Sequence, residues 1–183
     1  MKKICVILIL CFSGLAVSAQ DVKFGLQGGF TSLNGKSSNS LENISYSGTS
    51  SGFYLGGLLN FQLSEAIHLQ PSVNYVNADE ENLLMIPVIF QYYIENSGFY
   101  FLGGPQATLM LNQSSINGID VFKVFGFDLA IGAGYTINEN FFIEAKYSFE
   151  LTNRYSSDIQ DAAGSVEVDS KINAFTLGVG YKF

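Results

Sequence analysis

The side chains of this chain that could do chemistry are a few charged groups placed at alternate positions among apolar residues. In residues 141–151, for example, Glu144, Lys146 and Glu150 alternate with isoleucine, alanine, tyrosine and phenylalanine. Successive side chains of a β-strand point to opposite faces, so these charges share the face opposite the apolar one. Six such charges form a predicted interior polar network, namely Lys23, Asp128, Glu144, Lys146, Glu150 and Lys182.

The pairing of these charges follows from the short turn at residues 138–140. A three-residue turn there predicts three neighbouring pairs, namely Gly134 with Glu144, Gly132 with Lys146, and Asp128 with Glu150. Two adjacent carboxylates need a cation, so we expect Lys23, Lys146 or Lys182 to reach them, or one acid to keep its proton. A plug of ion pairs that fixes the shape of the protein is the favoured interpretation. A proton or ion path is the alternative.

Enzymatic chemistry would need a nucleophile beside a base. The single histidine, His68, falls on the inward face next to a short turn, which is typical of a hydrogen-bonded interior group. The sequence contains no GxGxxG, Walker A, HExxH or CxxC pattern. Acidic residues gather in 79–81 and 153–170, but their spacing matches no calcium loop. We therefore expect no catalysis, no cofactor and no metal site.

Residues 1–19 predict a cleaved secretory signal, with two early lysines, a short apolar stretch and small residues before the cleavage point. Both cysteines leave with this segment, so the domain at residues 20–183 has no disulfide. Cleavage also removes two of the nine basic residues, which leaves seven against sixteen acidic ones. Such an acidic chain excludes nucleic acid as a partner.

The elements that must position the charges are strands, because alternation with period two recurs along the chain. Eight runs show it, at residues 22–30, 53–63, 67–75, 84–94, 99–112, 125–137, 141–151 and 175–183. Tight turns are expected at residues 64–66, 95–98 and 138–140. Longer polar connections are expected at residues 33–51, 77–82, 113–120 and 153–170, of which the first is predicted to be surface-displayed. Short turns at one end and long loops at the other are typical of an outer-membrane barrel.

The composition of the polar faces of the eight runs indicates which face of the sheet points into the barrel. They contain mostly glycine, serine, threonine, asparagine and glutamine, and the chain is only 14% charged against roughly 25% for a soluble domain. Such faces suit a packed interior, with the apolar faces turned to lipid. Tyrosines near the ends of the apolar faces suit a girdle at the lipid headgroups: Tyr75, Tyr92, Tyr135 and Tyr181. We predict an all-β fold, an eight-stranded antiparallel up-and-down transmembrane β-barrel. A soluble lipocalin-like barrel that binds apolar ligands is the alternative.

Three prolines fall inside predicted strands. Pro71, Pro87 and Pro105 each remove a backbone donor from the ladder, which is costly at membrane depth. We therefore expect bulges or strand ends at these points.

A resemblance to the PorT-like outer-membrane β-barrel family (outer membrane protein beta-barrel domain) of Bacteroidota rests on four segments. They are LLMIPVIFQYYI, FYFLGGPQATLML, FDLAIGAGYTINENFFIEAKYSFELTN and the terminal GVGYKF. The resemblance implies the barrel fold and the outer membrane of a Gram-negative bacterium. We also expect both termini to be periplasmic. It implies no defined activity, although the namesake is linked to protein secretion. The alternation that ends at Phe183 is similar to the signal that barrel-assembly machinery recognises.

A non-catalytic structural or surface-interaction role is the favoured function. The expected partners are outer-membrane lipid and lipopolysaccharide, the barrel-assembly machinery, and a protein partner at the external loops. A component of a protein-secretion or envelope-assembly system is the alternative, followed by a lipid-modifying enzyme.

Overall fold

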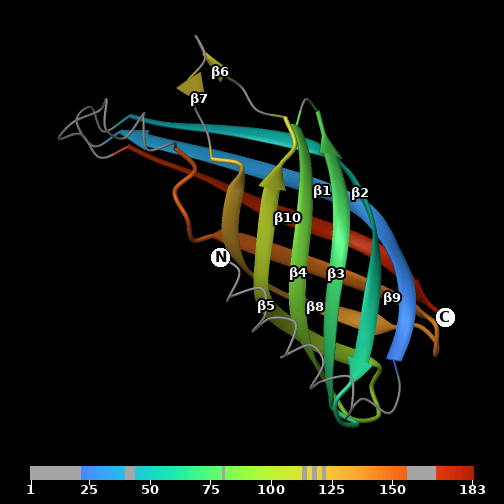
Figure 1. Cartoon of the computed structure of the whole chain (residues 1–183). Helices are drawn as coiled ribbons and strands as arrows, with labels where there is room; N and C mark the ends of the chain where they lie inside the picture. Colours follow the sequence, from blue (N-terminus) through green and yellow to red (C-terminus); the bar gives the residue numbers. More distant parts are fainter. Residues whose placement is uncertain are drawn as a thin grey trace, which may run out of the picture.

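The computed structural model describes residues 22–39, 44–79, 81–112, 115–116, 119–120, 123–155 and 168–183. The expected signal at residues 1–19 lies outside the described residues. Eight long antiparallel strands close into a barrel (Figure 1). They are β1 (Val22–Asn39), β2 (Ile44–Gln62), β3 (Ile67–Ala78), β4 (Glu81–Tyr93), β5 (Phe99–Met110), β8 (Phe125–Thr136), β9 (Phe141–Glu150) and β10 (Val168–Lys182). A small hairpin, β6 (Ser115–Ile116) and β7 (Ile119–Asp120), lies between β5 and β8.

Each barrel strand pairs with its neighbours along the chain, and β1 closes the barrel against β10. This is the predicted up-and-down topology. No helix among the described residues is long and apolar enough to cross a membrane.

The strands are offset in register around the barrel. Paired residues followed once around it from Val22 on β1 return to β1 at Ser32, ten residues further along the chain. The path runs through Phe61, Leu69, Phe90, Gly103, Ile131, Tyr147 and Phe175. Such an offset tilts the strands and, with eight strands, leaves an interior only wide enough for side chains.

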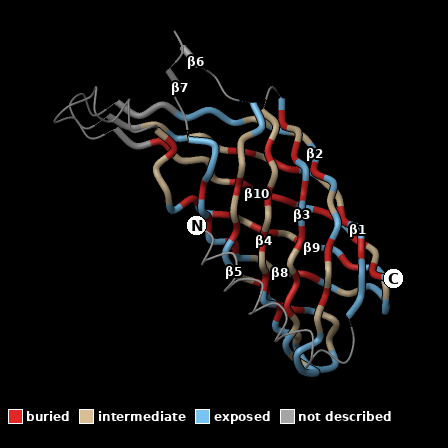
Figure 2. The backbone as a smooth tube through the Cα atoms, in the orientation of Figure 1, coloured by how far each residue is buried: buried red, intermediate tan, exposed pale blue. Residues whose placement is uncertain are grey.

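Burial alternates along each strand, as Figure 2 shows by the change of colour from residue to residue. In β8, the outward Phe125, Phe127, Leu129 and Ile131 are exposed, whereas the inward Asp128 is buried. The apolar face therefore points outward, as predicted, and the polar face lines the interior. In water this outer surface would be costly, and in a bilayer it meets hydrocarbon chains.

Aromatic rings gather on the outer face near the tight turns. Tyr181 lies between Phe141 and Phe183, with ring centroids 4.8 and 5.1 Å apart. Phe99 and Tyr135 form a second contact at 4.6 Å. Rings of this kind are typical of the headgroup boundary of a membrane barrel.

The three predicted tight turns are confirmed, and they lie at one end of the barrel, which we call the short-turn rim. The opposite end is the long-loop rim. Two predicted long connections there were wrong. The predicted loop at residues 77–82 is mostly strand, because β3 and β4 stay paired as far as Ala78 and Glu81, and Asp79 takes the left-handed conformation, with φ of 49°. Residues 33–51 are mostly strand, because β1 and β2 stay paired to Asn39 and Ile44.

The expectation of bulges or strand ends at the prolines was also wrong. The β2–β3 ladder is interrupted between the Leu58–Ser72 and Phe61–Leu69 pairs, on the side of Pro71, and then continues in the same register. Pro87 and Pro105 interrupt the β3–β4 and β4–β5 ladders in the same way. On their other sides the three prolines remain paired, with Val88, Gln106 and Leu129. Each proline therefore removes pairing over a short stretch of one ladder, and the register of the strands does not change.

Candidate functional site: a polar network inside the barrel

The inner face of β9 carries three of the six predicted charges, Glu144, Lys146 and Glu150, and glycines on its neighbour β8 make space for the first two. The three predicted pairs are confirmed: Gly134 lies beside Glu144, Gly132 beside Lys146, and Asp128 beside Glu150. A side chain at Gly134 would collide with the Tyr100 ring, and one at Gly132 with the backbone of β9. Glycine at these positions is therefore a packing requirement.

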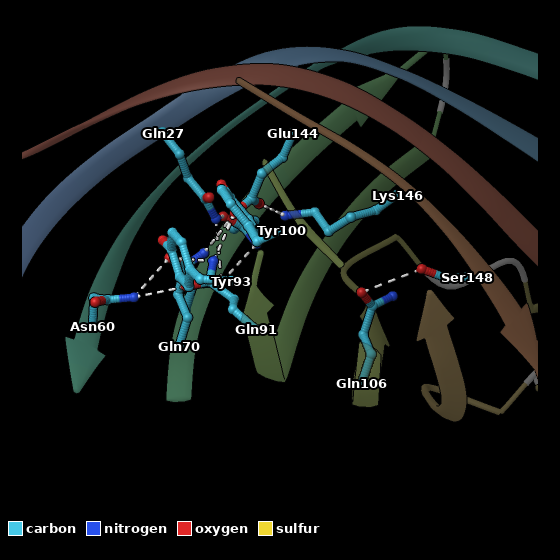
Figure 3. Close-up of polar contacts among 12 residues, drawn as sticks. Gln27, Asn60, Gln70, Gln91, Tyr93, Tyr100, Gln106, Glu144, Lys146 and Ser148 are labelled. Carbon is cyan, nitrogen blue, oxygen red and sulfur yellow. Dashed lines mark hydrogen bonds and ion pairs between the residues drawn. The ribbon is translucent and has the colours of Figure 1, made fainter. Parts of the chain in front are cut away.

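Glu144 is the centre of the network (Figure 3). Its Oε1 accepts hydrogen bonds from Gln70 at 3.3 Å, Gln91 at 2.9 Å and the Tyr100 hydroxyl at 2.9 Å. Its Oε2 accepts from Lys146 Nζ at 2.8 Å, an ion pair in which both side chains are buried. These donors come from β3, β4, β5 and β9, so one carboxylate ties together strands on different sides of the lumen.

A buried charge is costly unless it is paired and hydrogen-bonded. Glu144 has one cation and three neutral donors, which offset its loss of hydration. Its role is to hold side chains across the barrel. A general acid or base would need a reacting group within reach, and no cavity among those described opens onto the Glu144 carboxylate.

The network continues to the short-turn rim through amide side chains. Gln91 donates to Gln70 at 3.0 Å, and Asn60 donates to Gln91 at 2.9 Å. His68 Nδ1 lies 2.9 Å from Asn60 Oδ1, and its ring packs on Tyr93 with centroids 4.4 Å apart. The predicted role of His68 as a hydrogen-bonded interior group is confirmed.

A second cluster near the long-loop rim contains the predicted carboxylate pair. Asp128 accepts hydrogen bonds from Thr108 and Gln106, whereas Glu150 pairs with Arg154. The expectation that Lys23, Lys146 or Lys182 serves these acids was wrong, since the cation is Arg154, whose side chain is fully buried. Arg154 follows β9 within a segment predicted as a loop, so its sequence position did not indicate an inward direction. The acid pair indicated that a cation was needed, but it did not indicate that the cation was Arg154.

The two remaining network residues lie at the short-turn rim, apart from the carboxylates. Lys182 is buried, donates to the Tyr93 hydroxyl at 3.3 Å and lies 4.9 Å from the centre of the Phe142 ring. Lys23 is exposed.

Apolar side chains close part of the lumen nearer the long-loop rim. A buried cluster there comes from β1, β2, β3, β4 and β10, and consists of Leu33, Tyr54, Val76, Ala78, Leu83, Met85 and Ala174. Together with the Glu144 network, it occupies much of the interior, which in a barrel of eight strands is only wide enough for side chains. Among the described residues, no three His, Cys, Asp or Glu side chains are placed to hold a metal ion.

A closed, tilted eight-stranded barrel with an apolar outside and a filled polar inside defines a transmembrane β-barrel. Residues 5–183 match the family described as "Outer membrane protein beta-barrel domain". The chain therefore belongs to this family and is an integral outer-membrane β-barrel protein.

Solved structures show the same fold. The chain is similar to Neisserial surface protein A, with a TM-score of 0.53 and 16% identity over 90% of this chain and 100% of that one. It is also similar to Ail, the attachment invasion locus protein of Yersinia pestis, with a TM-score of 0.50 and 15% identity over 90% and 100%. The sequence matches none of the curated proteins with which it was compared.

Proposed function

We propose that this protein is a non-catalytic outer-membrane barrel that acts through a sheet projecting beyond the long-loop rim. The proposal rests on the lengths of three neighbouring strands, β10, β1 and β2. Pairing of β3 with β2 ends at the Ala78–Gly52 pair, and pairing of β9 with β10 ends at Ser148–Ala174. The β1 strand nevertheless remains paired with both neighbours as far as Asn39 (Figure 1). We call this β10–β1–β2 sheet the extension.

The composition of the extension fits water rather than lipid. Ser47, Gly48 and Thr49 are exposed, and the surrounding positions of β1 and β2 are mainly serine, asparagine and glycine. A bilayer would penalise such side chains, so the extension stands clear of the hydrocarbon. The two edges of the extension differ. The β10 edge is covered by the segment after β9, because Arg154 N donates to Ser170 O at 2.8 Å and Ser170 N donates to Asn153 Oδ1 at 3.2 Å. On the other edge, the pairing of β2 with β3 ends at Gly52, so β2 beyond Ser51 suits a partner that adds a strand.

Because side chains occupy the lumen, we place the functional surface on the outside of the barrel. Ion pairs, amides and the apolar cluster occupy the interior, so a path for solutes would require the displacement of buried, mutually bonded groups. The network in this view fixes the cross-section of the barrel and holds the extension on a rigid base.

Location and assembly follow from the same proposal. The short-turn rim and both termini face the periplasm, and the extension faces outward, as in outer-membrane barrels generally. Residues 1–19 direct export and are removed, the barrel contacts lipid and lipopolysaccharide, and the strand that ends at Phe183 engages the barrel-assembly machinery. A Bacteroidota source and a PorT-like relationship are the finer assignments that the sequence resemblance supports.

Cysteine labelling of whole cells tests the orientation and the display of the extension. Both native cysteines lie in the segment expected to be cleaved. We expect Ser47→Cys to react with a membrane-impermeant maleimide on intact cells. The matched variant Glu65→Cys, in the exposed turn between β2 and β3, should react only after the outer membrane is permeabilised. The reverse pattern would overturn the proposal.

Planar-bilayer recording tests the sealed lumen. The refolded barrel should give no steady conductance, and its mobility on a denaturing gel should shift on heating, which shows that the barrel is closed. A steady conductance from protein with a normal heat shift would contradict the proposed role of the interior.

A further inference from the structure

A cavity of about 130 Å³ opens at the short-turn rim, on the inner side of the barrel wall. Its lining includes Lys23, Asn60, His68, Tyr93, Glu139 and Lys182. Polar side chains from β1, β2, β3, β4 and β10 therefore converge on one space. This rim pocket plays no part in the proposed function, which concerns the opposite end of the barrel.

Two ammonium groups, those of Lys23 and Lys182, and one carboxylate, that of Glu139, line the rim pocket. Lys182 pairs in register with Gly25, which places Lys23 diagonally next to it on the same inner face. Neither lysine forms an ion pair with any carboxylate among the described residues. Lys182 is only 5% exposed and has two neutral neighbours, the Tyr93 hydroxyl at 3.3 Å and the Phe142 ring at 4.9 Å.

This arrangement is unusual in so acidic a chain. The sequence has sixteen acidic residues against nine basic ones, yet within the described part of the chain two of the basic residues share a pocket without an acid bonded to either. Two like charges repel each other, and the repulsion is stronger where water is partly excluded. An anion between them would remove the repulsion and form charge-assisted hydrogen bonds.

The rest of the wall is suited to hydrogen bonding. Tyr93 carries a hydroxyl at the Lys182 ammonium, and His68 is held in place by Asn60 and by the Tyr93 ring. The amide of Asn60 is itself bonded to Gln91. These contacts hold the wall rigid without filling the cavity, which is the arrangement that a binding site requires.

We propose that the rim pocket binds a small oxyanion, the phosphate or carboxylate group of a free solute or of a lipid headgroup at the rim. Lys182 and Lys23 supply the positive charge, and His68 and Tyr93 form the wall. Glu139, in the exposed turn between β8 and β9, opposes binding through its own charge.

The single histidine of the chain makes the test direct. The protein, refolded in a maltoside micelle and labelled at histidine, gives one set of imidazole NMR signals, and that set comes from the pocket wall. Inorganic phosphate replaces chloride at constant ionic strength. We expect a saturable shift of the His68 signals, whereas a linear drift with concentration would overturn the proposal.

Variants separate binding in the rim pocket from a general salt effect. Lys182→Gln and Lys23→Gln should each weaken phosphate binding by roughly tenfold or more, as expected for loss of a charge-assisted hydrogen bond. Lys182→Arg keeps the charge and should retain binding. Glu139→Gln should tighten binding. Lys36→Gln, an exposed lysine on the extension, is the matched control and should bind as the parent protein does. Equal affinity in the parent and in Lys182→Gln would overturn the proposal.

Two further measurements identify the source of the anion and check the fold. In nanodiscs, a His68 shift caused by phosphatidylglycerol without phosphate, relative to phosphatidylcholine, assigns the site to a headgroup. A shift that needs free phosphate assigns it to a solute, and no shift in either case contradicts the proposal. Each variant must keep the heat-dependent gel mobility of a closed barrel.

Discussion

Tyr100 on β5 and Gly134 on β8 are paired residues that share a single space inside the barrel. The phenol ring lies where a side chain of residue 134 would stand, and from there its hydroxyl donates to Glu144 at 2.9 Å. The central hydrogen bond of the network therefore depends on the absence of a side chain on the neighbouring strand.

Gly134→Ala should destabilise the barrel, because the new methyl group pushes the Tyr100 ring away from Glu144. We expect a loss of about 1–3 kcal/mol, the usual cost of overpacking a filled core. Urea unfolding of the refolded barrel measures this change in the free energy of unfolding. The control is Gly57→Ala, where the added methyl meets only the Gly25 carbonyl oxygen, at 3.9 Å. Equal losses in the two variants would show that the ring position is unimportant.

The Glu144–Lys146 pair should respond unequally to loss of either partner. Glu144→Gln leaves a buried ammonium unpaired and should cost about 3–5 kcal/mol. Lys146→Met should cost less, because Glu144 keeps three neutral donors. The double variant should recover part of the loss from Glu144→Gln. A double-mutant cycle from unfolding curves measures the coupling, and additive losses would contradict a bonded pair.

The β8–β9 region shows what alternation in a sequence can predict. Apolar residues at every second position indicate both the strand and its lipid face, because only one face of each strand meets hydrocarbon. The short turn at residues 138–140 then sets the register, so that even the Asp128–Glu150 pair could be predicted.

The sequence did not predict the extension or the inward direction of Arg154, and the reasons are physical. After Leu33, residues 34–39 are asparagine, glycine, lysine and serine and carry no apolar alternation, so this part of β1 depends on pairing with β2 and β10. Arg154 follows a strand end, where a chain can turn inward or outward. The burial of its side chain and its ion pair with Glu150 show that it turns inward, and its backbone bonds to Lys123 and Ser170 hold it there.

Arg154 should stabilise the long-loop rim as well as the Glu150 carboxylate. Its side chain pairs with Glu150 and donates to the Val124 carbonyl, while its backbone bonds to Lys123 and Ser170. Arg154→Met leaves Glu150 unpaired beside Asp128 and should cost about 3–5 kcal/mol in unfolding experiments. Adding Glu150→Gln to this variant should restore part of the lost free energy of unfolding. The exposed Lys36→Met is the control, and a similar loss there would argue against a specific role for Arg154.

The proline band across β3, β4 and β5 should be the part of the wall that opens most readily. Pro71, Pro87 and Pro105 lie at one level on adjacent strands, and each interrupts the ladder with the preceding strand. The β5–β8 ladder is continuous from Phe99–Tyr135 to Leu109–Phe125 and provides an internal comparison on the other edge of β5.

A missing ladder bond lowers the free energy of local opening, and about 1.4 kcal/mol corresponds to a tenfold change in the rate of hydrogen exchange. Amides in the rungs next to the three prolines should therefore exchange at least about tenfold faster than those of the β5–β8 ladder. Amide exchange followed by NMR in micelles measures both sets in one sample, and equal protection would mean that the barrel opens as one unit.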